Sequence, residues 1–156
     1  IKSNVYPKQI AFNVIPHIDK FMDNGYTKEE MKMVWETKKI LDNSIEVNPT
    51  TVRVPVFYGH SEAVHLELAQ KITANKVKDI LMDNSNDVVL IDEHKDGGYP
   101  CAANECEDSN DVFVGRVRED ISIPNGINLW VVSNNIRKGA AYNSIQIAEL
   151  LIKDYL

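Results

Sequence analysis

A chain of 156 residues is one domain's worth of sequence, and its apolar share of 44% beside 26% charged residues is that of an ordinary globular protein. The net charge of −6 argues against nucleic acid as a partner, because proteins that bind it usually carry a basic face. No apolar run approaches the ~20 residues of a membrane span, and the opening IKSNVYPKQI lacks a signal-peptide core. We therefore expect a cytoplasmic protein, without a membrane segment, whose two cysteines are reduced.

The first third of the chain predicts a strand, a helix and another strand. The segment QIAFNVIPHI (residues 9–18) is apolar and β-branched, which is typical of a strand. Thr27 and Glu30 form a capping-box pattern for a helix that ends near residues 42–43. One helical stripe, which should face a core, consists of Met31, Val34, Trp35 and Leu41. Residues 51–57 predict a strand, with an edge or a bulge at Pro55.

The middle of the chain predicts a strand at 62–68, a helix at 73–82 and a buried strand at 87–92. A polar surface loop is expected at 94–110. The last part predicts a strictly alternating strand at 111–120, a strand at 127–133 and a helix at 138–155. In the alternating strand one face would carry Val112, Val114, Arg116 and Arg118. The element order predicts an α+β fold, with a mixed, mostly antiparallel sheet and helices packed on one face. We expect a single domain over residues 1–156.

Arg53 and His60 are the residues that point most directly to chemistry. Arg53 lies in a β-branched run, and its five-donor fork suits a carboxylate or a phosphate. His60 follows that run, and histidine can accept and donate a proton near neutral pH. Together they indicate an anion site with an acid/base beside it. Taken singly, Arg53 fits better as a charge at a sheet edge, and His60 as a loop residue of no special role.

Three further residues are candidates on their spacing. Glu29 and Lys32 are three apart in a helix and share a face, so they could hold a zwitterion or a phosphate ester, or form an ordinary surface ion pair. Asn135 lies in the polar lead-in NNIRKG before the last helix, where a phosphate or an amide could bind. Cys101 and Cys106 have poor spacing for zinc and lie in an acidic stretch that disfavours a thiolate, so we expect neither a metal site nor a nucleophile there.

Five stretches in series resemble the C-terminal half of aspartate-semialdehyde dehydrogenases. These are QIAFNVIPHID, KEEMKMVWETKKIL, VRVPVFYGHSEAVHLE, DVFVGRVRED and LWVVSNNIRKGAAYNSIQIAELL. The resemblance implies the catalytic and dimerisation domain of that family, which is similar in fold to the C-terminal domain of glyceraldehyde-phosphate dehydrogenases. It also implies NADPH-dependent conversion of aspartyl-4-phosphate to aspartate 4-semialdehyde and phosphate, for lysine (through diaminopimelate), threonine and methionine biosynthesis, in a homodimer.

The resemblance assigns a role to each candidate residue. Arg53 would grip the substrate's α-carboxylate, and Glu29 would receive its α-ammonium group. Lys32 would hold the phosphate, His60 would be the acid/base, and Asn135 would contact the nicotinamide end of NADP.

The family's nucleophilic cysteine and its Gly-rich nucleotide loops are absent from this sequence. The chain is therefore expected to be a fragment that lacks its NADP-binding N-terminal domain and is inactive alone, with the helix of residues 134–156 packing on that domain in the whole enzyme.

Two other interpretations stay open at this point. A related acyl-phosphate reductase of the N-acetyl-glutamyl-phosphate type would have the same scaffold, but its acylated substrate gives Glu29 no ammonium group to bind. A non-catalytic dimerisation or binding module would not require Arg53, His60, Glu29 and Lys32 to meet at all.

Overall fold

The computed structural model describes residues 4–84 and 87–156, so the first three residues of the segment considered for a signal peptide lie outside it. Its contacts divide the chain into two compact units, one ending at Pro55 and the other running from Val56 to Leu156. The first unit contains one helix, and the second contains a four-stranded sheet. The expectation of one domain over the whole chain stays a prediction.

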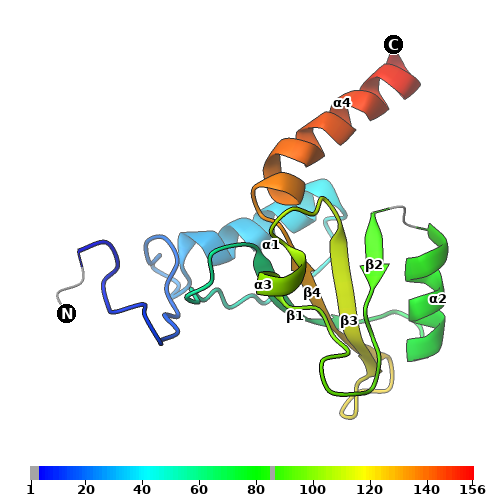
Figure 1. Cartoon of the computed structure of the whole chain (residues 1–156), viewed down its shortest axis with the longest axis horizontal. Helices are drawn as coiled ribbons and strands as arrows, with labels where there is room; N and C mark the ends of the chain where they lie inside the picture. Colours follow the sequence, from blue (N-terminus) through cyan, green and yellow to red (C-terminus); the bar gives the residue numbers. More distant parts are fainter. Residues whose placement is uncertain (1–3, 85–86) are drawn as a thin grey trace. The chain divides into compact units, whose positions relative to one another are not determined.

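Helix α1 (Lys28–Ile40) is the regular element of the first unit (Figure 1). The predicted capping box is confirmed, because Thr27 accepts from the Glu30 N–H and the Glu30 carboxylate accepts from the Thr27 N–H. The predicted core-facing stripe is wrong in part: Trp35 is 48% exposed, and Leu41 lies beyond the helix and is 72% exposed.

The two strands predicted at residues 9–18 and 51–57 are wrong. Residues 9–18 and 51–57 form no strand, and they meet through an isolated antiparallel bridge between Ile15 and Arg53. Phe12 and Asp19 have φ angles of 57° and 66°, and backbone in this left-handed region cannot continue an extended strand. A β-branched composition was therefore outweighed by turns on both sides of Ile15.

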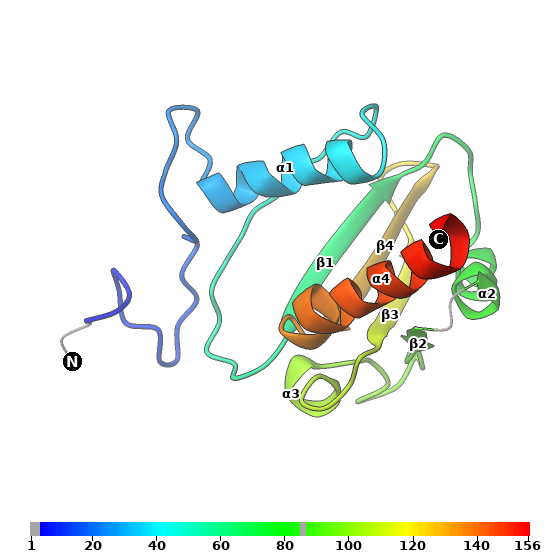
Figure 2. The same cartoon turned by 90° about the horizontal axis from the view of Figure 1, so that it is seen from above.

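The second unit is built on a sheet in the order β1-β4-β3-β2. Its strands are β1 (His60–Glu67), β2 (Val88–Leu90), β3 (Val112–Glu119) and β4 (Gly126–Ser133). Strand β4 pairs antiparallel with β1 and β3, whereas β2 pairs parallel with β3. Figure 2 shows β1, β4 and β3 side by side. The predicted α+β class with a mixed, mostly antiparallel sheet is confirmed.

Helices accompany this sheet at several points. Helix α2 (Ala74–Asn84) contacts β2 and β3, and the short α3 (Ala102–Glu105) contacts β4. A π-helical turn, η1 (Arg137–Ala141), leads into α4 (Tyr142–Tyr155), which projects away from the sheet in Figure 1. Among the described residues, no helix has the length and apolar character that crossing a membrane would require.

The core of the second unit is formed where α3 covers the sheet. Four buried residues make up its centre, with Ile91 and Trp130 packed against them: Ala102, Cys106, Phe113 and Val132. The prediction that residues 94–110 form only a surface loop is therefore wrong. This mostly polar segment contains two small residues, Ala102 and Cys106, that are buried against the sheet.

Strand β3 departs from the predicted strict alternation. The register against β4 shifts between Gly115 and Arg118, and Arg116 has a φ of 55°. Such an irregularity changes which face the following side chains occupy. Within this irregular stretch Val117 is buried, while Arg116 and Arg118 on either side of it are exposed.

Candidate active site

Arg53 is held at the bridge in the first unit. Its N–H donates to Ile15 O at 2.8 Å, and its carbonyl accepts from the Ile15 N–H at 3.0 Å. The half-buried side chain lies with its guanidinium carbon 5.3 Å from the centre of the Tyr6 ring. None of the ion pairs among the described residues involves Arg53, which leaves its fork to bind an external anion.

Glu29 and Lys32 lie in the first turns of α1, as their spacing predicts. The Lys32 Nζ is 3.3 Å from Glu29 Oε2, and the two side chains remain 42% and 36% exposed. An ion pair this accessible contributes little to stability. Both charges therefore stay available to a ligand that carries an ammonium and an anionic group.

Glu30 connects the helix turn of Glu29 and Lys32 with the segment of Arg53. The sequence indicates only its role in the helix cap. Its Oε2 accepts from the Thr27 N–H at 2.8 Å, and its Oε1 accepts from the Thr51 N–H at 2.9 Å. Hydrogen bonds from the Thr27 and Thr51 backbones lower the pKa of Glu30 below its usual value. Because Thr51 is two residues before Arg53, this buried carboxylate fixes α1 against the Arg53 segment.

His60 is the first residue of β1 in the second unit and pairs in register with Ser133 on β4. Its side chain is exposed, so a ligand can reach the ring. The preceding Gly59 has a φ of +79°, a conformation that L side chains rarely adopt. Glycine is therefore required at the turn that brings the chain to His60.

Asn135 lies beside this turn. Its Oδ1 accepts from the Gly59 N–H at 3.2 Å, across 76 residues of sequence. Its Nδ2 has no partner in the part of the chain that the structure describes, so it can donate to a carbonyl group of a ligand.

Asn134, which the sequence did not single out, anchors the same segment. It is 5% exposed, and its Nδ2 donates to Cys106 O at 2.6 Å and Glu107 O at 3.2 Å. Its Oδ1 accepts from the N–H groups of Ile136 and Arg137, both at 2.9 Å. The signal that could have found it is an Asn at a helix start, which commonly caps free N–H groups.

Two ion pairs hold η1 from other parts of the second unit. Arg137 contacts Asp108 at 3.0 Å, and Lys138 contacts Asp87 at 2.9 Å. Gln146 on α4 also donates to Asp87, at 2.5 Å. Hydrogen bonds from Gln146 and Lys138 lower the pKa of Asp87, so the carboxylate stays charged at neutral pH.

Cys106 does not have the surroundings of a nucleophile. Cys106 is fully buried, and burial together with the nearby Glu105 charge raises the pKa of its thiol. Both cysteines are free. Among the described residues, no group of three His, Cys, Asp or Glu side chains could hold a metal ion.

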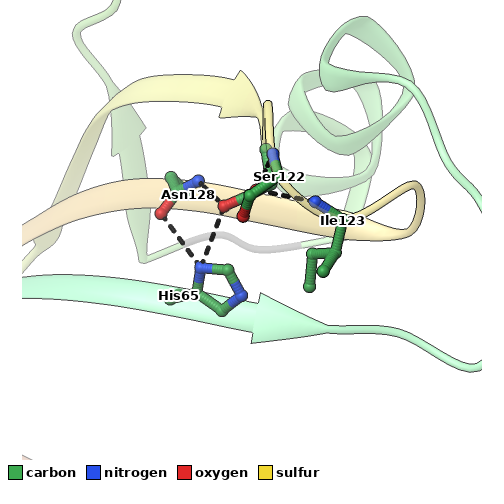
Figure 3. A network of polar contacts seen from close by, with 5 residues as sticks. His65, Ser122, Ile123 and Asn128 are labelled. Carbon is green, nitrogen blue, oxygen red and sulfur yellow. Dashed lines mark hydrogen bonds and ion pairs between the residues drawn. The ribbon is translucent and has the colours of Figure 1, made fainter.

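A separate polar cluster lies at the far end of β1 (Figure 3). The His65 Nδ1 is 3.2 Å from Asp120 Oδ2, which also accepts from Asn128 at 2.9 Å. Hydrogen bonds from Ser122 and Asn128 hold the pKa of Asp120 well below its usual range. This cluster ties β1 to the turn between β3 and β4.

The second unit also has a hollow of ≈ 310 Å³ on its sheet, lined in part by Arg116, Arg118 and Trp130. None of the predicted site residues lines it.

The predicted site residues thus form two groups, one in each unit. Arg53, Glu29 and Lys32 belong to the first unit, and His60 and Asn135 belong to the second. Their meeting around one ligand stays a prediction.

Comparison with known proteins gives a consistent match along the chain. The family model described as semialdehyde dehydrogenase, dimerisation domain, matches residues 1–138. The chain is 63% identical to an aspartate-semialdehyde dehydrogenase of Shewanella violacea and 59% identical to one of Legionella pneumophila. These alignments cover 99% and 97% of the chain but 45% and 44% of the relatives, so the chain spans about half their length.

Solved structures give the same result. The aspartate semialdehyde dehydrogenase II of Vibrio cholerae, also solved in complex with ASA, matches with a TM-score of 0.92 and 56% identity over 99% of this chain and 45% of that one. The Candida albicans enzyme, solved with NADP, matches with a TM-score of 0.74 and 27% identity over 91% of this chain and 45% of that one.

Proposed function

The chain belongs to the semialdehyde dehydrogenase dimerisation-domain family, and on this basis we propose that it is the C-terminal part of an NADP-dependent aspartate-semialdehyde dehydrogenase. The whole enzyme would convert aspartyl-4-phosphate and NADPH to aspartate 4-semialdehyde, phosphate and NADP, for lysine, threonine and methionine biosynthesis. The observation that carries this proposal is the 63% identity over 99% of the chain. The same family assignment leads us to expect activity in the cytoplasm.

Substrate binding is assigned to the first unit. Arg53 would bind the α-carboxylate with its fork, which is free of ion pairs among the described residues. Glu29 would accept hydrogen bonds from the α-ammonium group, and Lys32 would bind the phosphate. The 3.3 Å between Lys32 Nζ and Glu29 Oε2 supports this assignment. The substrate's ammonium group can replace Lys32 as the partner of Glu29, and its phosphate group can replace Glu29 as the partner of Lys32.

His60 is proposed as the acid/base. The nucleophile, a cysteine outside this chain, would lose its proton to the imidazole as its sulfur bonds to the acyl carbon and phosphate leaves. The imidazolium would then protonate the oxygen that becomes negative when hydride adds to the thioester. That proton would pass to the sulfur as the C–S bond breaks and aspartate semialdehyde leaves. Exposure of His60 at the start of β1 supports a role at a ligand-accessible edge.

NADP is the implied cofactor, and its reduced form, NADPH, would supply the hydride when bound. Within this chain, Asn135 fits its nicotinamide end: its Oδ1 is engaged by Gly59, and its Nδ2 is a donor suited to a carboxamide oxygen. The rest of the nucleotide would be held by an N-terminal domain of the whole enzyme, in line with the relatives' length, of which this chain covers 45%.

Two protein partners are proposed. The first is a second copy of the enzyme, in line with the description of the matching family as a dimerisation domain. The second is the enzyme's own N-terminal domain, which would cover α4. Exposed apolar residues on this helix support the second partner: Ile145, Ile147, Leu150, Leu151, Ile152 and Tyr155.

The test is an assay of the full-length enzyme for phosphate-dependent reduction of NADP with aspartate semialdehyde. We expect turnover in the wild type and its loss when phosphate is left out. Glu29→Gln should raise KM for aspartate semialdehyde, since the ammonium group loses its charged partner. An enzyme indifferent to Glu29 but active with an N-acylated semialdehyde would contradict the proposed substrate.

A further inference from the structure

The turn that carries His60 rests directly on a buried side chain. A Cβ atom added at Gly59 would lie 2.8 Å from Cys106 Sγ and 3.0 Å from Ser133 O. Cys106 is fully buried and belongs to the core beneath the sheet. The Gly59 backbone therefore cannot move inward without displacing the core.

A polar contact also holds the turn. The Gly59 N–H donates to Asn135 Oδ1 at 3.2 Å. Because an N–H group requires an acceptor, this bond also fixes the orientation of the amide, with Oδ1 toward Gly59 and Nδ2 away from it.

Asn135 is itself well supported. The preceding Asn134 is bonded to Cys106 O and Glu107 O, and the following η1 is held by Arg137 on Asp108 and by Lys138 on Asp87. A side chain whose neighbours are fixed in this way presents its oxygen at a defined position.

We propose that Asn135 is a positioning residue for His60, acting through the Gly59 N–H. This inference rests on the proposed acid/base role of His60. The peptide between Gly59 and His60 begins β1, so a shift of Gly59 changes the direction in which the imidazole is presented. The Asn135 side chain would thus position the His60 imidazole through Oδ1 and contact the nicotinamide end of NADP through Nδ2. It would connect the proton-transfer group with the cofactor.

The test separates the two functions of the amide with two variants of the full-length enzyme. Asn135→Ala removes both the acceptor and the donor, whereas Asn135→Asp keeps an acceptor oxygen and removes the donor. We expect both variants to raise KM for NADP. We expect kcat to fall by ~10- to 100-fold in Asn135→Ala, the size of effect that a misplaced catalytic group produces, and to fall less in Asn135→Asp.

Hydrogen exchange at the Gly59 amide is the second measurement, resolved to the residue by mass spectrometry. Exchange should accelerate at least tenfold in Asn135→Ala and stay near the wild-type rate in Asn135→Asp. The pH dependence of kcat should also change in Asn135→Ala, since the surroundings of His60 change. Asn128→Ala is the matched control, because Asn128 pairs with His65 at the far end of the same strands; it should leave the kcat profile unchanged.

An Asn135→Ala enzyme with wild-type kcat, pH profile or Gly59 exchange would overturn the inference, whatever its KM for NADP. His60→Ala, measured in parallel, distinguishes this failure from failure of the proposed function. A fully active His60→Ala enzyme overturns both. An inactive His60→Ala beside an unimpaired Asn135→Ala overturns only the positioning role.

Discussion

Glu30 and Thr51 are joined by a hydrogen bond of 2.9 Å between Oε1 and the backbone N–H, across 21 residues of sequence. The same carboxylate closes the capping box at the start of α1. One buried side chain therefore connects the helix turn that carries Glu29 and Lys32 with the segment that carries Arg53.

We expect Glu30→Gln to destabilise the first unit. An amide offers one acceptor oxygen where the carboxylate uses two, so one of the N–H groups of Thr27 and Thr51 loses its partner. An unsatisfied buried donor costs about 1–3 kcal/mol, which urea unfolding should detect. In the full-length enzyme KM for aspartate semialdehyde should rise as well.

Glu29→Gln is the matched control for that experiment, because Glu29 is the adjacent residue and its ion pair is exposed. The free energy of unfolding should change by less than about 1 kcal/mol. Equal destabilisation by the two variants would contradict the special role of Glu30.

We expect His60→Ala to lower kcat of the full-length enzyme by ~10²–10⁴-fold, the usual loss when an acid/base is removed. Arg53→Lys should instead act mainly on KM for aspartate semialdehyde, since a lysine keeps the charge but loses the two-donor fork. Steady-state kinetics of both variants checks this. An Arg53→Lys enzyme with wild-type KM would remove the carboxylate-binding role.

Asp120 gives a pH dependence with a defined sign. Its folded-state pKa is depressed by hydrogen bonds from Ser122 and Asn128 relative to the ordinary value of 3.8. A depressed carboxyl pKa stabilises the fold above the ordinary value, and this contribution is lost as the pH falls below it. We therefore expect Asp120→Asn to lose stability at pH 7, with the difference from the wild type shrinking steadily as the pH falls from about 4 to about 2.

Urea unfolding followed by tryptophan fluorescence between pH 2 and 7 measures this difference. Asp83→Asn is a suitable control, because Asp83 is exposed on α2 and should shift the curve little. A stability difference between Asp120→Asn and the wild type that stays constant across the pH range would contradict the prediction.

The apolar surface of α4 predicts effects of different size in the 156-residue chain and in the proposed full-length enzyme. Ile152 is 64% exposed, so Ile152→Lys should change the stability of the 156-residue chain by less than about 0.5 kcal/mol. In the full-length enzyme the same change should lower Tm by several degrees, because a charge would be placed against the N-terminal domain. An unchanged Tm in the full-length enzyme would contradict the proposed contact between α4 and the N-terminal domain.

Cysteine reactivity provides a test of the core. Burial raises the pKa of the Cys106 thiol, and only the thiolate reacts with alkylating reagents. We expect iodoacetamide at pH 8 to modify the half-buried Cys101 first and Cys106 only after unfolding, as measured by peptide mass spectrometry. Rapid labelling of Cys106 in the folded chain would contradict the packing beneath Gly59.

Elements specified by neighbouring residues were predicted well from the sequence. The capping box of Thr27 and Glu30, strand β1 and helix α2 all depend on patterns within a few residues. The strands expected at 9–18 and 51–57 failed because strand formation needs a partner along its length, and this pair meets only at Ile15 and Arg53. The register shift in β3 is likewise a property of its pairing with β4.

The sequence by itself determined the family, the identities of the candidate residues and the α+β class, since all of these follow from residue types and their order. Only the tertiary structure decided that Glu30 holds the Arg53 segment and that Asn135 holds the turn before His60. The bonded groups are 21 and 76 residues apart, and no local pattern specifies which donor reaches which acceptor over such distances. Those contacts form only when the folded backbone brings the donors and acceptors together.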